Sequence, residues 1–149
     1  FLRILYQHRK LLSQQIKVVG KWLMALSAMT ATVKLFLQLG STIPSLSQLA
    51  FGFRPIVIAY LHLVLLGVIT LFLLATIFSN DNLPLKKATL FGLSIFVIGI
   101  FFNEFVLMLQ GVASFSYNSI PFANEFLLLI ACTMFLGILI MVISQLKRL

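Results

Sequence analysis

The sequence predicts an all-α integral membrane protein, an antiparallel bundle of about four transmembrane helices within a longer chain. Its composition is 61% hydrophobic and only 9% charged, with a mean hydropathy of +1.12, whereas a soluble domain is about half apolar and about a quarter charged. Several stretches reach the roughly 20 apolar residues that a membrane-spanning helix needs. Basic residues gather in alternate connections, as expected for loops on opposite sides of a membrane.

Residues 1–16, "FLRILYQHRKLLSQQI", precede the first expected span. They lack the basic start, apolar middle and small-residue cleavage site of a signal peptide. We expect either a basic cytoplasmic segment or the tail of an earlier helix. Because the chain opens on Phe1 and not on Met, we expect it to be part of a longer protein.

The first span, residues 20–39, contains Lys34, which would cost about 3 kcal/mol at the membrane centre. Loop charge supports the span nonetheless. With four spans, the outer side holds only Arg54, and the inner side holds Arg3, Arg9, Lys10, Lys17, Lys21, Lys86, Lys87, Lys147 and Arg148. We therefore place Lys34 about one turn from the outer end, where its stem can extend to the headgroups. Trp22 suits the inner interface.

The other three spans, residues 56–78, 88–109 and 126–144, are apolar runs without proline. All four prolines fall in connections or at helix starts, where a missing N–H costs little. "SNDNLP" predicts an inner turn, and the longer outer segments "STIPSLSQLAFGFR" and "GVASFSYNSIPFANE" could lie along the interface, with Tyr117 at headgroup level. Short connections make neighbouring helices antiparallel.

Two ionisable residues share one depth in adjacent spans. At 1.5 Å per residue, His62 lies roughly 9 Å and Glu104 about 8 Å from the outer ends of their helices. A neutral or shared-proton pair would lower the cost of burying both. Other polar side chains are expected at this level or at the rim: Asn103, Gln110, Arg54, Lys34 and Glu125. The inner half offers mainly hydroxyl groups and Cys132, and most of these hydroxyls can bond to carbonyls of their own helix.

Structural roles compete with functional ones. His62 could bond to a neighbouring carbonyl and stabilise packing, ligate haem or a metal, or handle protons. Glu104 has either a function or a structural bond to His62, Lys34 or a missing helix, and Asn103 suits helix packing. Cys132 is expected to be a small buried residue. Four glycines are expected to permit close helix approach: Gly92, Gly99, Gly111 and Gly137.

Several function classes lack their motifs. The sequence has no cysteine pair, HExxH, P-loop, glycine-rich nucleotide fingerprint or GxSxG elbow, so we expect neither a metal centre nor a catalyst in this chain alone. The net charge of +8 does not indicate nucleic acid binding, because the basic residues flank apolar runs. The expected partners are the lipid bilayer and other membrane helices or subunits.

Two elements carry a family resemblance: "RPIVIAYLHLVLLGVITLFL" and "FNEFVLMLQG". Across about residues 41–112 the chain resembles multi-helix bacterial membrane proteins that are distantly similar to the haem-copper oxidase catalytic subunit. The resemblance implies a helical membrane fold in a bacterial cytoplasmic membrane, with His62 as a candidate haem ligand. The further histidines of a second haem and a copper site are missing, which excludes oxygen reduction by this chain alone.

Three functional hypotheses follow. The first is a helical membrane subunit or fragment associated with haem and electron transport, in which His62 binds the cofactor near the outer leaflet. The second is a non-catalytic structural or assembly subunit of a larger membrane complex. The third is a small transporter or sensor of an acidic or protonatable solute. In each, both ends of this chain are expected to be cytoplasmic.

Overall fold

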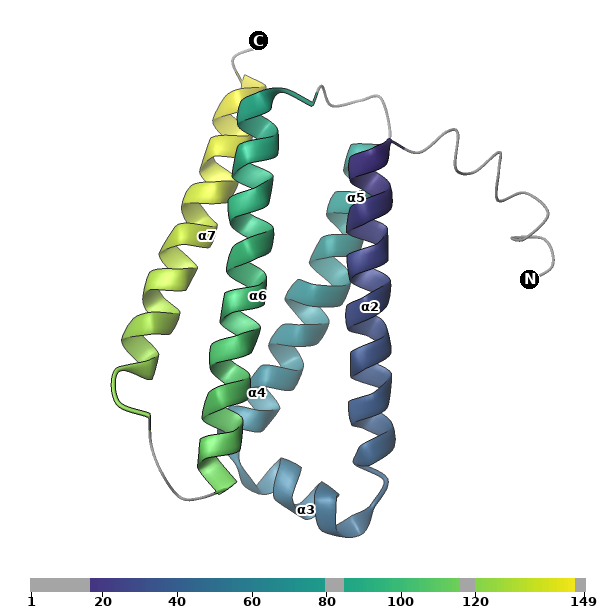
Figure 1. Ribbon diagram of the computed structural model, residues 1–149, viewed down its shortest axis with the longest axis vertical. Helices are drawn as coiled ribbons and strands as arrows, with labels where there is room; N and C mark the ends of the chain where they lie inside the picture. The colour runs from purple at the N-terminus through teal and green to yellow at the C-terminus, as the bar shows by residue number, and fades with distance from the viewer. Residues whose placement is uncertain (1–16, 80–84, 116–119, 147–149) are drawn as a thin grey trace, which may run out of the picture.

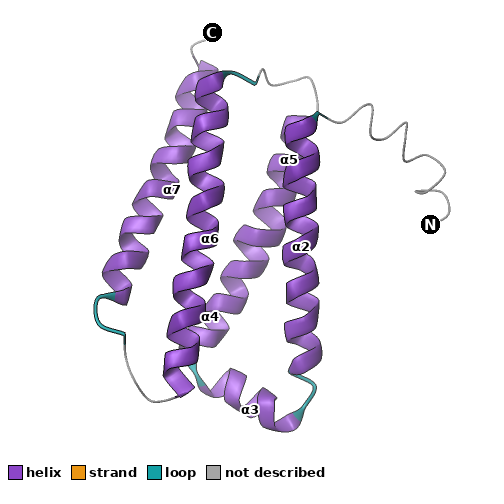
Figure 2. Ribbon diagram, viewed as in Figure 1, coloured by secondary structure: helices purple, strands orange, loops and turns teal. Residues whose placement is uncertain are grey.

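The computed structural model describes residues 17–79, 85–115 and 120–146. Within these ranges the regular structure is entirely helical (Figure 1, Figure 2). Four helices are long and apolar enough to cross a membrane, which is the number that the sequence predicts: Val18–Gly40, Arg54–Ser79, Lys87–Ser114 and Ala123–Leu146. Residues 1–16, most of the inner turn and Tyr117 lie outside the described residues.

Helix α2, Val18–Gly40, is the first of these spans. It has neither proline nor an internal glycine after its first turn, so its apolar run continues as one helix. It ends where hydroxyl groups bond to its last carbonyls: Ser41 Oγ donates to Gln38 O at 2.8 Å, and Thr42 Oγ1 to Leu39 O at 2.7 Å. Such bonds satisfy acceptors that the helix end leaves open.

The connection that follows forms a short helix, α3, Pro44–Gly52. Pro44 stands in its first turn, where the missing N–H has no intrahelical partner to lose. Figure 1 shows α3 running across the lower ends of the spans instead of along them. This orientation agrees with the expectation that the segment lies along the membrane interface.

The second span is a single oblique column made of three parts: α4, Arg54–His62; η1, a π-helix over Leu63–Thr70; and α5, Leu71–Ser79. A π-helix longer than one turn is rare. In Figure 1 the column starts beside α6 and ends beside α2, and the main contacts agree, because α4 packs on α6 whereas η1 and α5 pack on α2. The column therefore joins the two sides of the molecule.

The last two spans, α6, Lys87–Phe115, and α7, Ala123–Leu146, form the closest pair. A Cβ on Gly92 would lie 2.6 Å from Gly137 O, and a Cβ on Gly137 would lie 2.8 Å from Gly92 O. The prediction that these glycines permit close approach is thus confirmed. Helix α6 continues beyond the expected end at Leu109, because residues 110–115 contain no proline or other helix breaker besides Gly111.

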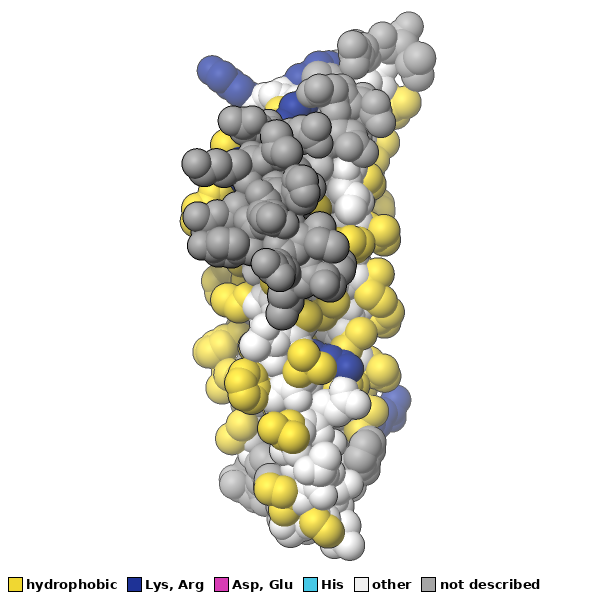
Figure 3. Space-filling model, turned by 90° about the vertical axis from the view of Figure 1, so that its right-hand side faces the viewer, with side chains coloured by type: hydrophobic (Ala, Val, Ile, Leu, Met, Phe, Trp, Pro, Cys, Tyr) yellow, Lys and Arg dark blue, Asp and Glu magenta, His cyan; other side chains and the backbone are white. Residues whose placement is uncertain are grey.

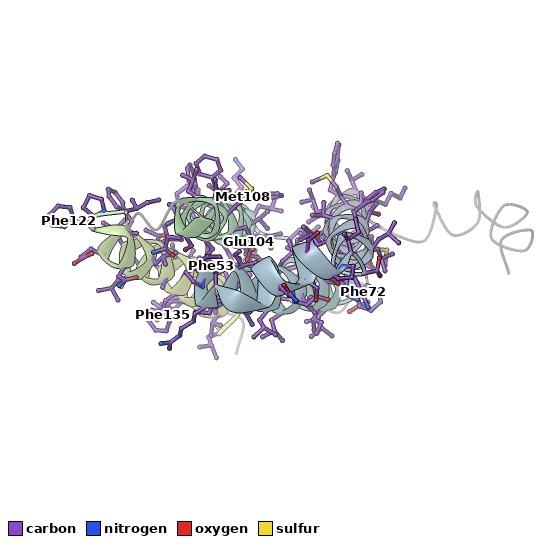
Figure 4. The ribbon with its side chains drawn as sticks, turned by 90° about the horizontal axis from the view of Figure 1, so that it is seen from below. Phe53, Phe72, Glu104, Met108, Phe122 and Phe135 are labelled. Atoms are coloured by element: carbon purple, nitrogen blue, oxygen red, sulfur yellow. The ribbon has the colours of Figure 1, made fainter. Side chains whose placement is uncertain are left out.

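The helices form a thin layer, which Figure 4 shows from below. A small core of nine buried residues joins all four spans: Leu23, Leu71, Ala75, Phe78, Leu93, Phe96, Ile100, Met134 and Met141. Most of the remaining apolar surface is uncovered, including Trp22 and Phe36 at 69% exposure and Phe135 at 63%. Where the described residues form the surface, Figure 3 shows mainly hydrophobic side chains along one edge of the layer. In a membrane, lipid or other helices would cover this surface.

Candidate functional site

His62 is the last residue of α4 and adjoins the π segment. Its Nδ1 lies 2.9 Å from the carbonyl oxygen of Ile58, one turn earlier. Because a carbonyl only accepts hydrogen bonds, Nδ1 carries the proton in this pair. In the neutral imidazole, Nε2 is therefore the acceptor. The half-buried ring is held by its own helix and keeps one lone pair for another partner.

Glu104 comes from helix α6, on which α4 packs, and its carboxyl group lies within electrostatic range of His62. Figure 4 shows Glu104 between α6 and the oblique span. The structure thus brings together the two residues for which the sequence predicts a common depth. We call His62, Asn103 and Glu104 the outer polar cluster.

Two buried atoms of the outer polar cluster make no well-formed hydrogen bond among the described residues, Asn103 Nδ2 and Glu104 Oε1, although the Asn103 amide lies close enough to the Glu104 carboxyl group to interact with it. Both atoms are buried, and the Asn103 side chain as a whole is only 8% exposed. An unpaired polar group inside an apolar environment costs about 1–3 kcal/mol by protein mutational data. One of these atoms is a donor and the other an acceptor, so a species with both functions, such as a water molecule, could satisfy them together.

The other predicted polar residues lie apart from this cluster. Lys34 Nζ donates to Gln38 Oε1 at 2.6 Å on the exposed surface of its own helix. Arg54 is exposed at the start of α4, and Glu125 is exposed in the first turn of α7. Gln110 is half-buried on α6, where its backbone carbonyl accepts a hydrogen bond from Ser114 Oγ at 2.8 Å. None of these four side chains is therefore assigned to the outer polar cluster.

No metal-ligand set forms within residues 17–79, 85–115 and 120–146: three His, Cys, Asp or Glu side chains do not come together there. His62 is the only histidine within these ranges, so a second histidine ligand for a haem bound to it would come from outside them. Cys132 is exposed on α7, so the expectation of a buried cysteine is wrong. Because α7 packs mainly on α6, the face carrying Cys132 is left uncovered.

A second polar contact, between α2 and the π segment, was not apparent from the sequence. Ser27 Oγ donates to Val68 O at 2.9 Å, and Thr30 Oγ1 lies 2.6 Å from Gly67 O, closer than to Ser27 O of its own helix at 2.8 Å. Both hydroxyl-bearing side chains are buried. Their spacing of three residues puts them on one face of α2, and Gly67 marks a point of close backbone approach. Together these features were the available signal.

The remaining hydroxyls of the inner half behave largely as expected, since they bond to carbonyls of their own span: Thr70 to Leu65, Thr76 to Leu73, Ser94 to Leu90 and Thr133 to Ile130. A further interhelical link closes the inner end of the α6–α7 pair. There the Thr89 and Ser144 hydroxyls lie 3.0 Å apart, and Lys86 Nζ donates to Ser144 O at 2.9 Å. The described inner hydroxyls are thus already engaged in structural bonds.

Comparison with protein families, with curated proteins and with solved structures finds no match to this chain. The resemblance to proteins distantly similar to the haem-copper oxidase subunit stays a prediction.

Proposed function

We propose that this chain is a non-catalytic helical subunit of a larger membrane complex. The observation that carries the proposal is how little of each span the rest of the chain covers. Within the described residues, at most 39% of the apolar 18-residue stretch of any candidate span is buried. The outermost helices each pack mainly against one neighbouring span: α2 against η1 and α5, and α7 against α6. The molecule therefore offers long helix faces to which other membrane helices can pack.

Polar side chains on these uncovered faces support a covering that includes protein as well as lipid. Cys132 and Thr133 are exposed on α7, about 15 Å from the helix start at 1.5 Å per residue, which is near the middle of a membrane. On α2, Thr32 and Gln38 are exposed. Interfaces between transmembrane helices are enriched in small and hydroxyl-bearing residues.

Site-specific crosslinking in the source membrane tests this proposal. A photoreactive residue at exposed Thr133 is expected to capture another polypeptide, whereas the same residue at the adjacent buried Met134 is expected to crosslink only within the chain. Native mass spectrometry after mild extraction should show an assembly heavier than the 16.7 kDa chain. Recovery of the monomer alone, with only lipid adducts at Thr133, would contradict the proposal.

The same proposal includes an orientation, with the basic ends in the cytoplasm of a bacterial cell. The support is that Lys17, Lys21, Lys86 and Lys87 adjoin the shared end of α2 and α6, whereas Arg54 begins α4 at the opposite end. Cys132 is the one cysteine of the chain, so a Cys132→Ser background permits single-cysteine labelling. An impermeant maleimide should reach Gln48→Cys in intact cells but Lys87→Cys only after lysis. The opposite pattern would contradict this orientation.

A second candidate function is haem binding in a redox complex, in which His62 would be one ligand. What supports it is the Nδ1–Ile58 bond, because ligating histidines commonly donate their other ring N–H to a carbonyl, which orients the ring. A bound haem would supply one-electron transfer at this depth. The purified assembly is expected to show a Soret band that His62→Ala shifts or removes; no band, or one unchanged by the substitution, would exclude this role.

A further inference from the structure

An open cleft lies between α2 and α6 and extends from their first turns to the third turn of α6. It has a volume of about 320 Å³ and is lined mainly by apolar side chains: Val19 and Trp22 from α2, and Leu90, Ser94, Val97 and Ile98 from α6, among others. Both helices start at the same end of the molecule (Figure 1). The cleft therefore extends from that end along the apolar part of the layer.

The end at which the cleft begins is basic. Lys17 and Lys21 lie at the start of α2, and Lys86 and Lys87 at the start of α6, with no acidic residue in the first turn of either helix. Figure 3 shows basic side chains gathered at this upper end. Two parallel helix starts add partial positive charge there. An apolar cleft and a basic rim are thus adjacent along the direction of the membrane normal.

This arrangement matches an amphiphile with an anionic head and an apolar tail. We propose that the cleft between α2 and α6 binds one acyl chain of an anionic phospholipid, whose phosphate is held by Lys21 and Lys87, one from each helix start. Trp22, which is 69% exposed and lines the cleft, has the amphipathic ring typical of the headgroup level.

Trp22 also supplies the probe, because it is the one tryptophan of the full sequence. The whole chain is reconstituted into phosphatidylcholine vesicles that contain a fixed fraction of lipid brominated on its acyl chains. At equal fraction, brominated phosphatidylglycerol is expected to quench Trp22 more strongly than brominated phosphatidylcholine. With each lysine worth about 1 kcal/mol near an anionic headgroup, the relative affinity should favour the anionic lipid by about fivefold or more.

Matched variants separate this site from general lipid contact. Lys21→Gln and Lys87→Gln together should bring the preference close to one, whereas Lys34→Gln, an equivalent change far along α2, should keep it. Ser94→Phe, at an exposed position that lines the cleft, should lower quenching by the anionic lipid without loss of helical circular dichroism. Equal quenching by the two lipids, or a preference that survives the paired lysine change, would overturn the proposal.

A soluble competitor distinguishes a lipid from a free phosphate at the rim. Glycerol phosphate added to both sides of the vesicles is expected to leave the quenching unchanged, because it has no acyl chain for the cleft. Relief of quenching by this compound would overturn the proposal, since it would show a site for the phosphate alone.

Discussion

Two polar contacts join the oblique second span to its neighbours, and they differ in whether their hydrogen bonds are complete. Between α2 and the π segment, Ser27 and Thr30 bond to the carbonyls of Val68 and Gly67. Between α4 and α6, Asn103 Nδ2 and Glu104 Oε1 are buried without a well-formed hydrogen bond within the described residues, although the Asn103 amide interacts weakly with the Glu104 carboxyl group. The first contact is complete in this chain, so we assign it to stability. The second leaves binding capacity, so it is the candidate site.

Adding a large side chain at Gly67, within the contact between α2 and the π segment, should have the largest effect on stability. A Cβ on Gly67 would lie 3.1 Å from Thr30 Cγ2, so the rest of a leucine side chain would push α2 away and break the Thr30 bond. We expect Gly67→Leu to lower the free energy of unfolding by about 2–3 kcal/mol, the upper range for overpacking. The measurement is unfolding in mixed detergent micelles.

Gly40→Leu is the matched control for this change, because nothing lies within 4 Å of a Cβ at that position. It should alter the free energy of unfolding by less than about 0.5 kcal/mol, as surface substitutions usually do. If both leucines destabilise the protein equally, the effect of Gly67→Leu does not come from the contact with α2.

Removing the hydroxyls of the complete contact should have an intermediate effect. Ser27→Ala and Thr30→Val together delete the donors to Val68 O and Gly67 O. Interhelical hydrogen bonds in membranes contribute about 0.6–2 kcal/mol each, and we expect a combined loss of about 1–2 kcal/mol in the same unfolding assay. Thr32→Val is the control, since the Thr32 hydroxyl bonds to Ala28 O of its own helix. A loss as large in the control would refute the interhelical role.

The number of spans could be predicted because it depends on quantities that a sequence contains directly. Apolar length identifies the runs, and the side on which lysines and arginines fall supports the weakest run despite Lys34. The common depth of His62 and Glu104 follows from a constant helical rise. These predictions need no knowledge of which helix face meets which neighbour.

The features that could not be predicted depend on which helix faces meet in the folded chain. Ser27 can bond to its own helix or to another, and only the approach of Gly67 decides between them. The π segment Leu63–Thr70 is as apolar as the α-helix that follows it in the same span, Leu71–Ser79. The sequence pattern therefore does not distinguish the two. Cys132 sits among apolar residues on all sides of α7, and composition alone cannot tell a buried face from an exposed one when lipid is the solvent.

A substitution in the contact between α4 and α6 should change the free energy of unfolding least. The sign of that change tests whether this contact lacks hydrogen bonds that the other contact has. Asn103→Leu removes a buried donor that makes no well-formed hydrogen bond within the described residues, so it loses only the weak interaction with the Glu104 carboxyl group and removes a desolvation cost. We expect the free energy of unfolding to stay within about 0.5 kcal/mol of the unmodified chain or to rise by up to about 1 kcal/mol. Phe102→Leu, at the exposed neighbouring position, controls for the introduction of a leucine into this part of α6. A loss of about 1–2 kcal/mol for Asn103→Leu but not for Phe102→Leu would show that the amide has a partner in the membrane, and the two contacts would then be equally complete.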